Sequence, residues 1–220
     1  VFLAGAGFVD VQRRVGTRTE KAGAYDVVFV TCAFQRARLD IKVVFDGSGK
    51  IAGLFFQPAA PSSEAKAPYV DQTTFDEKEV AFGSDTWRLP GTLSMPKGPG
   101  PFPAVALVHG SGPQDRDETV GANKPFRDLA WGLASKGIAV LRYEKRTKAR
   151  AADLNPLPLP FTVKEETIDD AAAALMTLEE TPGIDASRVF VLGHSLGATL
   201  VPRILAQMQT TAGGILLAAS

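Results

Sequence analysis

Apolar and polar residues alternate with a period of two between Tyr25 and Phe56, most regularly over residues 38–43. Such alternation is typical of antiparallel strands that bury one face and expose the other to water. The turn residues Asp46-Gly47-Ser48-Gly49 tolerate positive φ, so they predict a hairpin between the last two strands. Phe8 to Arg18 is a weaker strand candidate. We therefore expect residues 1–57 to form a small antiparallel sheet domain of α+β type, with its covering helices outside this sequence.

A change of pattern predicts a second domain. Residues 58–72 are rich in Pro, Ala and Ser and poor in large apolar side chains, which is the composition of a stiff linker. Beyond them, Val80–Phe82 and Trp87–Leu93 flank the turn Gly83-Ser84-Asp85 and predict an antiparallel hairpin. The alternation then gives way to solid apolar blocks, which suit parallel strands buried on both faces. These blocks are Ala104–Val108, Ile138–Leu141, Val189–Leu192 and Gly214–Ala219.

Helical periodicity fills the intervals between these blocks. The first helix is predicted from apolar residues at 3.6-residue spacing that end at a capping glycine: Phe126, Leu129, Ala130, Leu133 and Gly137. A second helix is predicted to begin at the capping-box-like sequence Thr167-Ile168-Asp169-Asp170, and a third follows residue 195. Strands and helices in alternation, with short connections, predict an α/β domain over residues 73–220. Its sheet should be mostly parallel, with helices on both faces.

The sequence Gly193-His194-Ser195-Leu196-Gly197 lies between the apolar block that ends at Leu192 and the third helix. It has the form G-x-S-x-G in the strand–turn–helix context that gives this short pattern its meaning. A sharp turn should hold the serine in a strained conformation, because side chains at the two glycine positions would collide with the neighbouring strand and helix. The hydroxyl would then stand beside a helix N-terminus, whose N–H groups favour a developing anion. We predict Ser195 as a nucleophile; the alternative is a chance match in a glycine-rich chain.

A second glycine motif, His109-Gly110-Ser111-Gly112, directly follows the block that ends at Val108. In this architecture, the loop at that position contributes one backbone N–H to an oxyanion hole, and the residue after the nucleophile contributes the other. We predict Ser111 as the loop donor, because the flanking glycines let its backbone approach a substrate oxygen, and Leu196 as the second donor. The candidates for substrate contact are His109, Gly110, Gly112 and His194. The alternative is a glycine-rich turn with a structural histidine.

Two charged stretches follow predicted strands. Residues 116–118, Arg-Asp-Glu, lie in the loop after the first parallel strand, near the expected substrate, and a solvated ion-pair network explains them equally well. Residues 142–146, Arg-Tyr-Glu-Lys-Arg, follow another strand at the end where open sheets place ligand contacts. Such a run is usually a solvent-exposed loop, and we adopt that interpretation.

Composition narrows the class of protein. Hydrophobic residues make up 45% and charged residues 22%, as in ordinary globular domains. Lys plus Arg and Asp plus Glu both number 24, so no overall basic field exists to attract nucleic acid. No apolar run reaches the roughly 18 residues that span a bilayer. The single cysteine, Cys32, is expected to be a small buried residue. We expect no metal and no organic cofactor, and the cellular compartment stays open.

The two glycine motifs, in this order, give residues from about 75 to 220 a resemblance to the first two-thirds of an α/β-hydrolase domain. Four short sequence motifs resemble those of a bacterial esterase-like group: His109-Gly110-Ser111-Gly112-Pro113, Asp115-Arg116-Asp117-Glu118, Asn123-Lys124-Pro125-Phe126 and Arg142-Tyr143-Glu144-Lys145-Arg146. In that group, a small domain of unknown function often precedes the hydrolase, and Tyr25 to Phe56 resembles its last strands. The resemblance implies an incomplete α/β-hydrolase fold preceded by a small antiparallel domain.

The resemblance also implies a mechanism. A histidine takes the proton of Ser195, the serine attacks an acyl carbonyl, and water hydrolyses the acyl-enzyme. The triad order in this fold is serine, acid, histidine, yet residues 196–220 contain no Asp, Glu or His. We therefore expect the acid and the histidine to lie beyond residue 220, and this chain alone to be inactive. The strand Gly214–Ala219 would be a bare apolar edge, which the missing segment or another chain is expected to cover.

The implied function is hydrolysis of carboxylic esters or thioesters, with a small-molecule ester as substrate. A peptidase or an acyltransferase with the same serine is an alternative, because the fold and the nucleophile do not fix the acyl acceptor. A further alternative is a catalytically incomplete module that binds a partner.

Overall fold

The computed structural model describes residues 11–34, 38–59, 67–84, 87–120, 123–154 and 162–218. The chain divides into two compact units, Val1–Ala65 and Lys66–Ser220. Parts of several predicted segments lie outside the described residues: 8–10 of the first strand candidate, 60–66 of the linker, Asp85 of the second hairpin turn and Ala219 of the last strand.

The first unit contains a four-stranded antiparallel sheet in the order β1-β2-β3-β4. Its strands are β1 (Val11–Ala22), β2 (Tyr25–Phe34), β3 (Arg38–Phe45) and β4 (Ile51–Pro58). The predicted hairpin between β3 and β4 is present, with Val43 opposite Leu54. In its turn, the Asp46 carboxylate accepts the backbone N–H groups of Ser48 and Lys50 at 2.9 and 3.0 Å. Local turn chemistry therefore sets the register of this hairpin.

A small core lies within this sheet. Cys32 and Leu39 are buried in it, so Cys32 has the apolar environment predicted for it. The carboxylate of Asp40 is also buried, and it accepts hydrogen bonds of 2.6 Å from Thr31 Oγ1 and Arg18 Nη1. These bonds offset the cost of removing the charge from water.

The second unit is built on a six-stranded sheet in the order β10-β9-β7-β8-β6-β5. The strands are β5 (Phe75–Phe82), β6 (Leu89–Pro96), β7 (Phe102–Val108), β8 (Ala139–Tyr143), β9 (Ile184–His194) and β10 (Gly213–Leu217). β7, β8, β9 and β10 are parallel, and β5 and β6 form the predicted antiparallel hairpin at one edge. Trp87 precedes β6, although it was expected within that strand. The central strands β7 and β8 are buried on both faces, which explains their unbroken apolar sequences.

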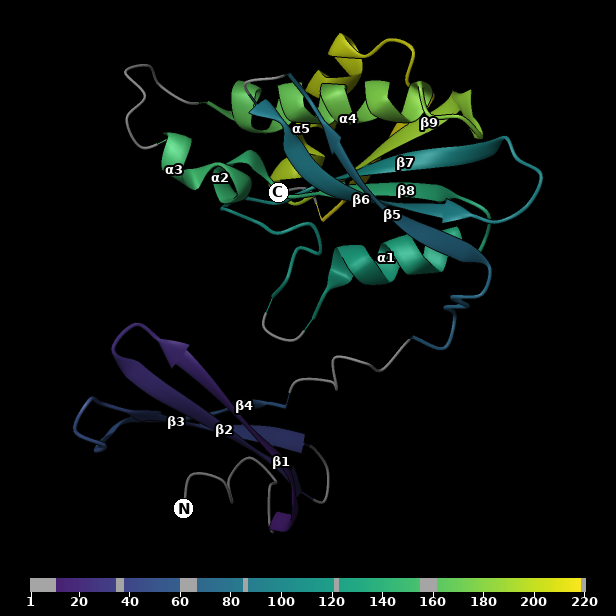
Figure 1. Ribbon diagram of the computed structural model, residues 1–220. Helices are drawn as coiled ribbons and strands as arrows, with labels where there is room; N and C mark the ends of the chain where they lie inside the picture. The colour runs from purple at the N-terminus through teal and green to yellow at the C-terminus, as the bar shows by residue number, and fades with distance from the viewer. Residues whose placement is uncertain are drawn as a thin grey trace. The chain divides into compact units, whose positions relative to one another are not determined.

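Helices cover both faces of this sheet (Figure 1). They are α1 (Pro125–Ala134), α4 (Asp169–Glu179) and α5 (Leu196–Gln207), with the short helical segments α2 (Arg146–Ala149), α3 (Ala151–Leu154) and η3 (Lys164–Ile168). On one face, Phe126 of α1 packs in a core with Val105 and Val140. On the other face, α4 and α5 contribute to a larger core. The predicted fold class is confirmed: a mostly parallel sheet with helices on both faces follows a small antiparallel domain.

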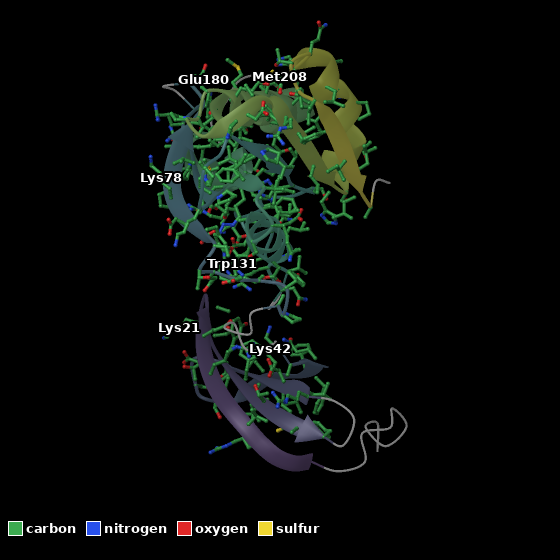
Figure 2. The ribbon with its side chains drawn as sticks, turned by 90° about the vertical axis from the view of Figure 1, so that its right-hand side faces the viewer. Lys21, Lys42, Lys78, Trp131, Glu180 and Met208 are labelled. Atoms are coloured by element: carbon green, nitrogen blue, oxygen red, sulfur yellow. The ribbon has the colours of Figure 1, made fainter. Side chains whose placement is uncertain are left out.

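The parallel connections place equivalent ends of the elements together. Glu180 directly follows α4 and Met208 directly follows α5, and Figure 2 labels both on the side of this unit that carries these helices. β7, β8, β9 and β10 are parallel neighbours, so their amino ends share one rim of the sheet. The carboxyl ends meet at the opposite rim, where open α/β sheets bind ligands.

The predicted start of α4 at Thr167 is wrong. Thr167 is buried inside a continuous helical segment, because the π-helical turn η3 directly precedes α4. The segment begins near Thr162, whose Oγ1 accepts the Lys164 N–H at 3.1 Å. The Glu165 carboxylate in turn accepts the Thr162 N–H at 3.0 Å. These bonds resemble a capping box, with the Thr162 hydroxyl accepting the N–H two residues on rather than three, so a similar signal occurs about one turn earlier than expected.

Candidate active site

The two glycine motifs meet at the carboxyl rim of the parallel sheet. His109-Gly110-Ser111-Gly112 follows β7, and Gly193–Gly197 joins β9 to α5. β7 and β9 are neighbours, with Val108 opposite Gly193. Two segments that lie far apart in sequence are therefore brought side by side.

Ser195 lies at a sharp turn between β9 and α5. Its backbone has φ 51° and ψ −117°, a region that residues with a side chain rarely adopt. Its N–H donates to the Leu217 carbonyl of β10 at 3.0 Å, which anchors the turn to the sheet. The residue is half-buried rather than enclosed in the core. Backbone strain of this kind costs about 1–3 kcal/mol and occurs mainly at functional sites.

Two glycines allow this turn. A Cβ on Gly193 would lie 2.4 Å from the carbonyl atoms of Gly197. A Cβ on Gly197 would lie 2.3 Å from the carbonyl oxygen of Val108. These neighbours are backbone atoms, which cannot rotate away as a flexible side chain does. The close packing of α5 against β7 and β9 therefore requires glycine at both positions.

The loop after β7 lies against Ser195. A Cβ on Gly110 would be 3.3 Å from Ser195 Cβ, so the Gly110 backbone is next to the serine. Ser111 is exposed, and Gly112 has φ 84°, a left-handed conformation that favours glycine. Leu196 is the first residue of α5, and the first N–H groups of a helix have no acceptor within it. Ser111 and Leu196 thus lie close to Ser195, one in the adjacent loop and one next along the chain.

The His109 ring is buried rather than directed to the rim. The residue is 1% exposed, and Nε2 lies 3.0 Å from the Asp115 carbonyl oxygen. The ring also contacts Phe126 and Tyr143, with centroids 5.1 Å apart in both cases. Burial, assisted by the charge of Lys145, lowers the pKa of His109 from 6.5 to about 3, so the ring is neutral at pH 7. The geometry corresponds to the alternative of a structural histidine, and it does not allow the predicted contact between the His109 side chain and a substrate.

Glu118 connects the two glycine motifs, a role that the sequence did not reveal. The residue is 3% exposed and has φ 51°. Its Oε1 accepts the Gly110 N–H at 2.7 Å and lies 3.0 Å from His194 Nδ1. The His194 side chain is 37% exposed, so its ring reaches the surface of the site. A solvated ion-pair network is therefore the wrong interpretation for Glu118.

The charged stretch 142–146 begins inside β8, which includes Arg142 and Tyr143, and most of it is buried, so its interpretation as an exposed loop after the strand is wrong. Arg142, Lys145 and Arg146 are 4%, 1% and 8% exposed. Lys145 Nζ donates to the Gly110 carbonyl oxygen at 2.8 Å and lies 3.4 Å from Glu166 Oε1. Buried cations persist because acceptors of this kind offset the lost hydration.

Ion pairs link the rim loops to the rest of the unit. The Arg146 guanidinium binds the buried Asp170 carboxylate of α4, with Nε 3.1 Å from Oδ2. Arg116 binds Glu79 of β5 at 2.7 Å and Glu144 at 3.0 Å. For Arg116, the ion-pair alternative therefore holds.

The described residues contain no cluster of three or more His, Cys, Asp and Glu side chains arranged to hold a metal ion. In the same part of the chain, no helix is both long and apolar enough to cross a membrane.

Comparisons with known proteins give one close sequence relative and several similar folds. No family model matches the chain. Esterase EstD from Thermotoga maritima is 49% identical over 180 residues, which are 82% of this chain and 41% of that protein. The chain thus spans less than half the length of this curated relative.

Two solved structures share the fold. The hypothetical protein PA2218 from Pseudomonas aeruginosa has a TM-score of 0.53 and 15% identity, over 71% of this chain and 46% of that one. The α/β hydrolase GrgF from Penicillium sp. sh18 has a TM-score of 0.51 and 17% identity, over 66% and 46%. At such identities, the similarity concerns the fold alone.

Proposed function

We propose that this chain is part of an esterase-like α/β hydrolase and supplies Ser195 as the nucleophile for hydrolysis of carboxylic esters or thioesters. The 49% identity to an esterase supports ester chemistry. The same relationship supports a small-molecule ester as the substrate.

In the proposed reaction, Ser195 Oγ gives its proton to a general base and attacks the acyl carbonyl carbon. The carbonyl oxygen becomes an oxyanion, and the backbone N–H groups of Ser111 and Leu196 donate to it. The tetrahedral intermediate then collapses: the bond to the alcohol or thiol breaks, and the leaving group takes the proton from the base. Water hydrolyses the acyl-serine and restores the hydroxyl. These steps use no metal and no organic cofactor.

The substrate is proposed to lie over the backbone of Gly110 and Gly112. Gly110 is next to the serine, and Gly112 has no Cβ to obstruct an acyl group. The exposed part of the His194 ring borders the same space. We assign His109 no contact with substrate, because its ring is buried and bonded to the Asp115 carbonyl.

Neither histidine of this chain is assigned as the general base. His109 is buried and neutral, and His194 Nδ1 is held by Glu118. We propose that the base and its acidic partner come from residues outside this sequence, as the order serine, acid, histidine implies. The same residues are proposed to cover β10, where Ile215, Leu216 and Leu217 are 49%, 51% and 43% exposed.

The single observation that carries the proposal is the backbone of Ser195. A serine is kept at φ 51° and ψ −117°, between glycines that have no room for a side chain, at the N-terminus of α5. An ordinary turn gains nothing from a strained serine, because glycine adopts this conformation at lower cost.

The test uses the full-length gene product, with hydrolysis of p-nitrophenyl acetate and labelling by a fluorophosphonate as readouts. Ser195→Ala is expected to abolish both. Ser187→Ala is the matched control, because Ser187 is exposed on the same strand, and it should change neither readout. Labelling that survives Ser195→Ala, or a wild-type protein without esterase activity, would refute the proposal.

A further inference from the structure

The peptide group between Gly110 and Ser111 is held by a buried charged side chain. Lys145 Nζ donates to the Gly110 carbonyl oxygen at 2.8 Å, and both residues are buried. On the preceding peptide group, the Gly110 N–H donates to Glu118 Oε1 at 2.7 Å. Two ionisable side chains from distant parts of the sequence thus bind successive polar groups of one glycine.

The geometry of a trans peptide links Lys145 to Ser111. The C=O and N–H of one planar peptide group point in opposite directions. Because Lys145 fixes the Gly110 oxygen, the Ser111 N–H must point away from Lys145. A cation bonded to the carbonyl also polarises the group, which makes the opposite N–H a stronger donor.

The position of Lys145 is itself fixed. Its Nζ lies 3.4 Å from Glu166 Oε1, and the same oxygen accepts a hydrogen bond of 2.8 Å from Thr147 Oγ1. Burying an ion pair does not in general stabilise a fold more than apolar residues of similar size. A buried lysine that binds the oxyanion loop therefore points to a role beyond stability.

Glu118 fixes the same glycine from the other side. It adopts a positive φ although it is not glycine, and its Oε2 is buried without a hydrogen-bond partner among the described residues. Its Oε1 joins Gly110 to His194, the residue before Ser195. These bonds hold the loop against the serine. The two backbones are so close that a Cβ added to Gly110 would lie 3.3 Å from Ser195 Cβ.

We propose that Lys145 and Glu118 are positioning residues that act through Gly110: they orient the Ser111 N–H toward the oxyanion, and Lys145 strengthens it as a donor. This inference rests on the proposed function and deepens it. Neither residue touches the substrate, so each affects the transition state through the backbone of the loop. Their effect should appear where negative charge develops on the carbonyl oxygen and not where the neutral ester binds.

The test compares variants of the full-length gene product. Lys145→Met removes the ammonium and keeps the length of the side chain. Because it removes the cation beside the partly buried Glu166, which keeps only the bond from Thr147, the double variant Lys145→Met/Glu166→Leu removes both charges and is expected to fold. Glu166→Gln alone retains the bond from Lys145 to Gly110. Lys148→Met is the matched control, since Lys148 is exposed three residues further along.

Both variants without the ammonium are expected to lose ~10- to 100-fold in kcat with little change in KM, less than the loss on removing an oxyanion donor itself. Affinity for a trifluoromethyl ketone, whose adduct carries an oxyanion, should fall by the same factor. Glu118→Met should act in the same way, and Glu118→Gln, which keeps an acceptor oxygen, should restore most of kcat. Glu166→Gln, which weakens the support of Lys145 but keeps its bond to Gly110, should lose less kcat than Lys145→Met, and Lys148→Met should stay within about threefold of wild type.

The double variant decides the result. If it folds, hydrolyses the ester within about threefold of the wild-type kcat and binds the ketone as tightly, the inference is overturned and the proposed function stands. If the wild-type protein has no esterase activity, the proposed function falls and the inference falls with it.

Discussion

Gly197 packs so closely on Val108 that a Cβ on the glycine would lie 2.3 Å from the Val108 carbonyl oxygen. The first turn of α5 therefore lies directly on β7, and the direction in which α5 leaves β9 is fixed. Ser195 precedes this helix, so its position depends on the same contact.

Gly197→Ala is expected to lower the free energy of unfolding by about 2 kcal/mol, because α5 must move away from β7 to admit the methyl group. In the full-length gene product, the proposed esterase activity should be lost with it. Urea denaturation and p-nitrophenyl acetate hydrolysis measure the two effects. Gly213→Ala is the control, since its Cβ would meet only the Phe190 ring at 3.6 Å. Equal losses in both variants would contradict the packing argument.

Ser195→Gly is expected to unfold with a free energy about 1 kcal/mol higher than Ser195→Ala. Glycine relieves the backbone strain at φ 51°, and this gain exceeds the extra entropy that glycine loses on folding. Alanine keeps the Cβ and hence the strain. Chemical denaturation of the two inactive proteins measures the difference directly. A Ser195→Gly protein that is the less stable of the two would show that the turn carries no strain.

The buried pair of Arg146 and Asp170 should behave as a unit. Arg146→Met or Asp170→Leu alone is expected to cost about 3–5 kcal/mol, because each leaves an uncompensated charge in the core. The double variant should be more stable than either single variant. A double-mutant cycle in urea measures the coupling. Additive losses would mean that the two charges do not depend on each other.

Stability should fall with acid in a way that depends on His109. Its pKa is about 3 in the folded protein and 6.5 without the fold, so between these values the unfolded chain binds more protons. Stability is then fully present above about pH 6.5 and decreases as the pH falls toward 3, by about 1 kcal/mol per pH unit. His109→Gln removes this contribution. The free energy of unfolding by which the wild type exceeds the variant should therefore shrink as the pH falls from 6.5 to 4. Between pH 7 and 8 the difference should stay constant.

The fold was predictable because its signals are local. Unbroken apolar sequences identified the strands around β7 and β9, and the turn at Asp46 identified a hairpin. Gly193 and Gly197 identified the sharp turn at Ser195, because only a close contact explains both glycines. In each case, the residues that carry the signal are neighbours in sequence or in one strand–turn–helix unit.

The supporting residues of the site were not predictable, because their partners are distant in sequence. Lys145 and Arg146 belong to a run of charges that is usually exposed, and their burial depends on Gly110 and Asp170. Glu118 likewise becomes a link between the two motifs only when β7 and β9 are adjacent. A charged residue alone does not show whether water or another side chain satisfies it.

The four parallel strands point their carboxyl ends toward Ser195, so the rim formed by their amino ends lies away from the candidate site. The connections there, such as residues 97–101 before β7 and 180–183 before β9, are attachment points for a dye, an affinity tag or a solid support. A protein tethered through them would present the rim that carries Ser195 to the solution. Under the proposed function, full-length protein immobilised in this way should hydrolyse an ester at the rate of the free molecule.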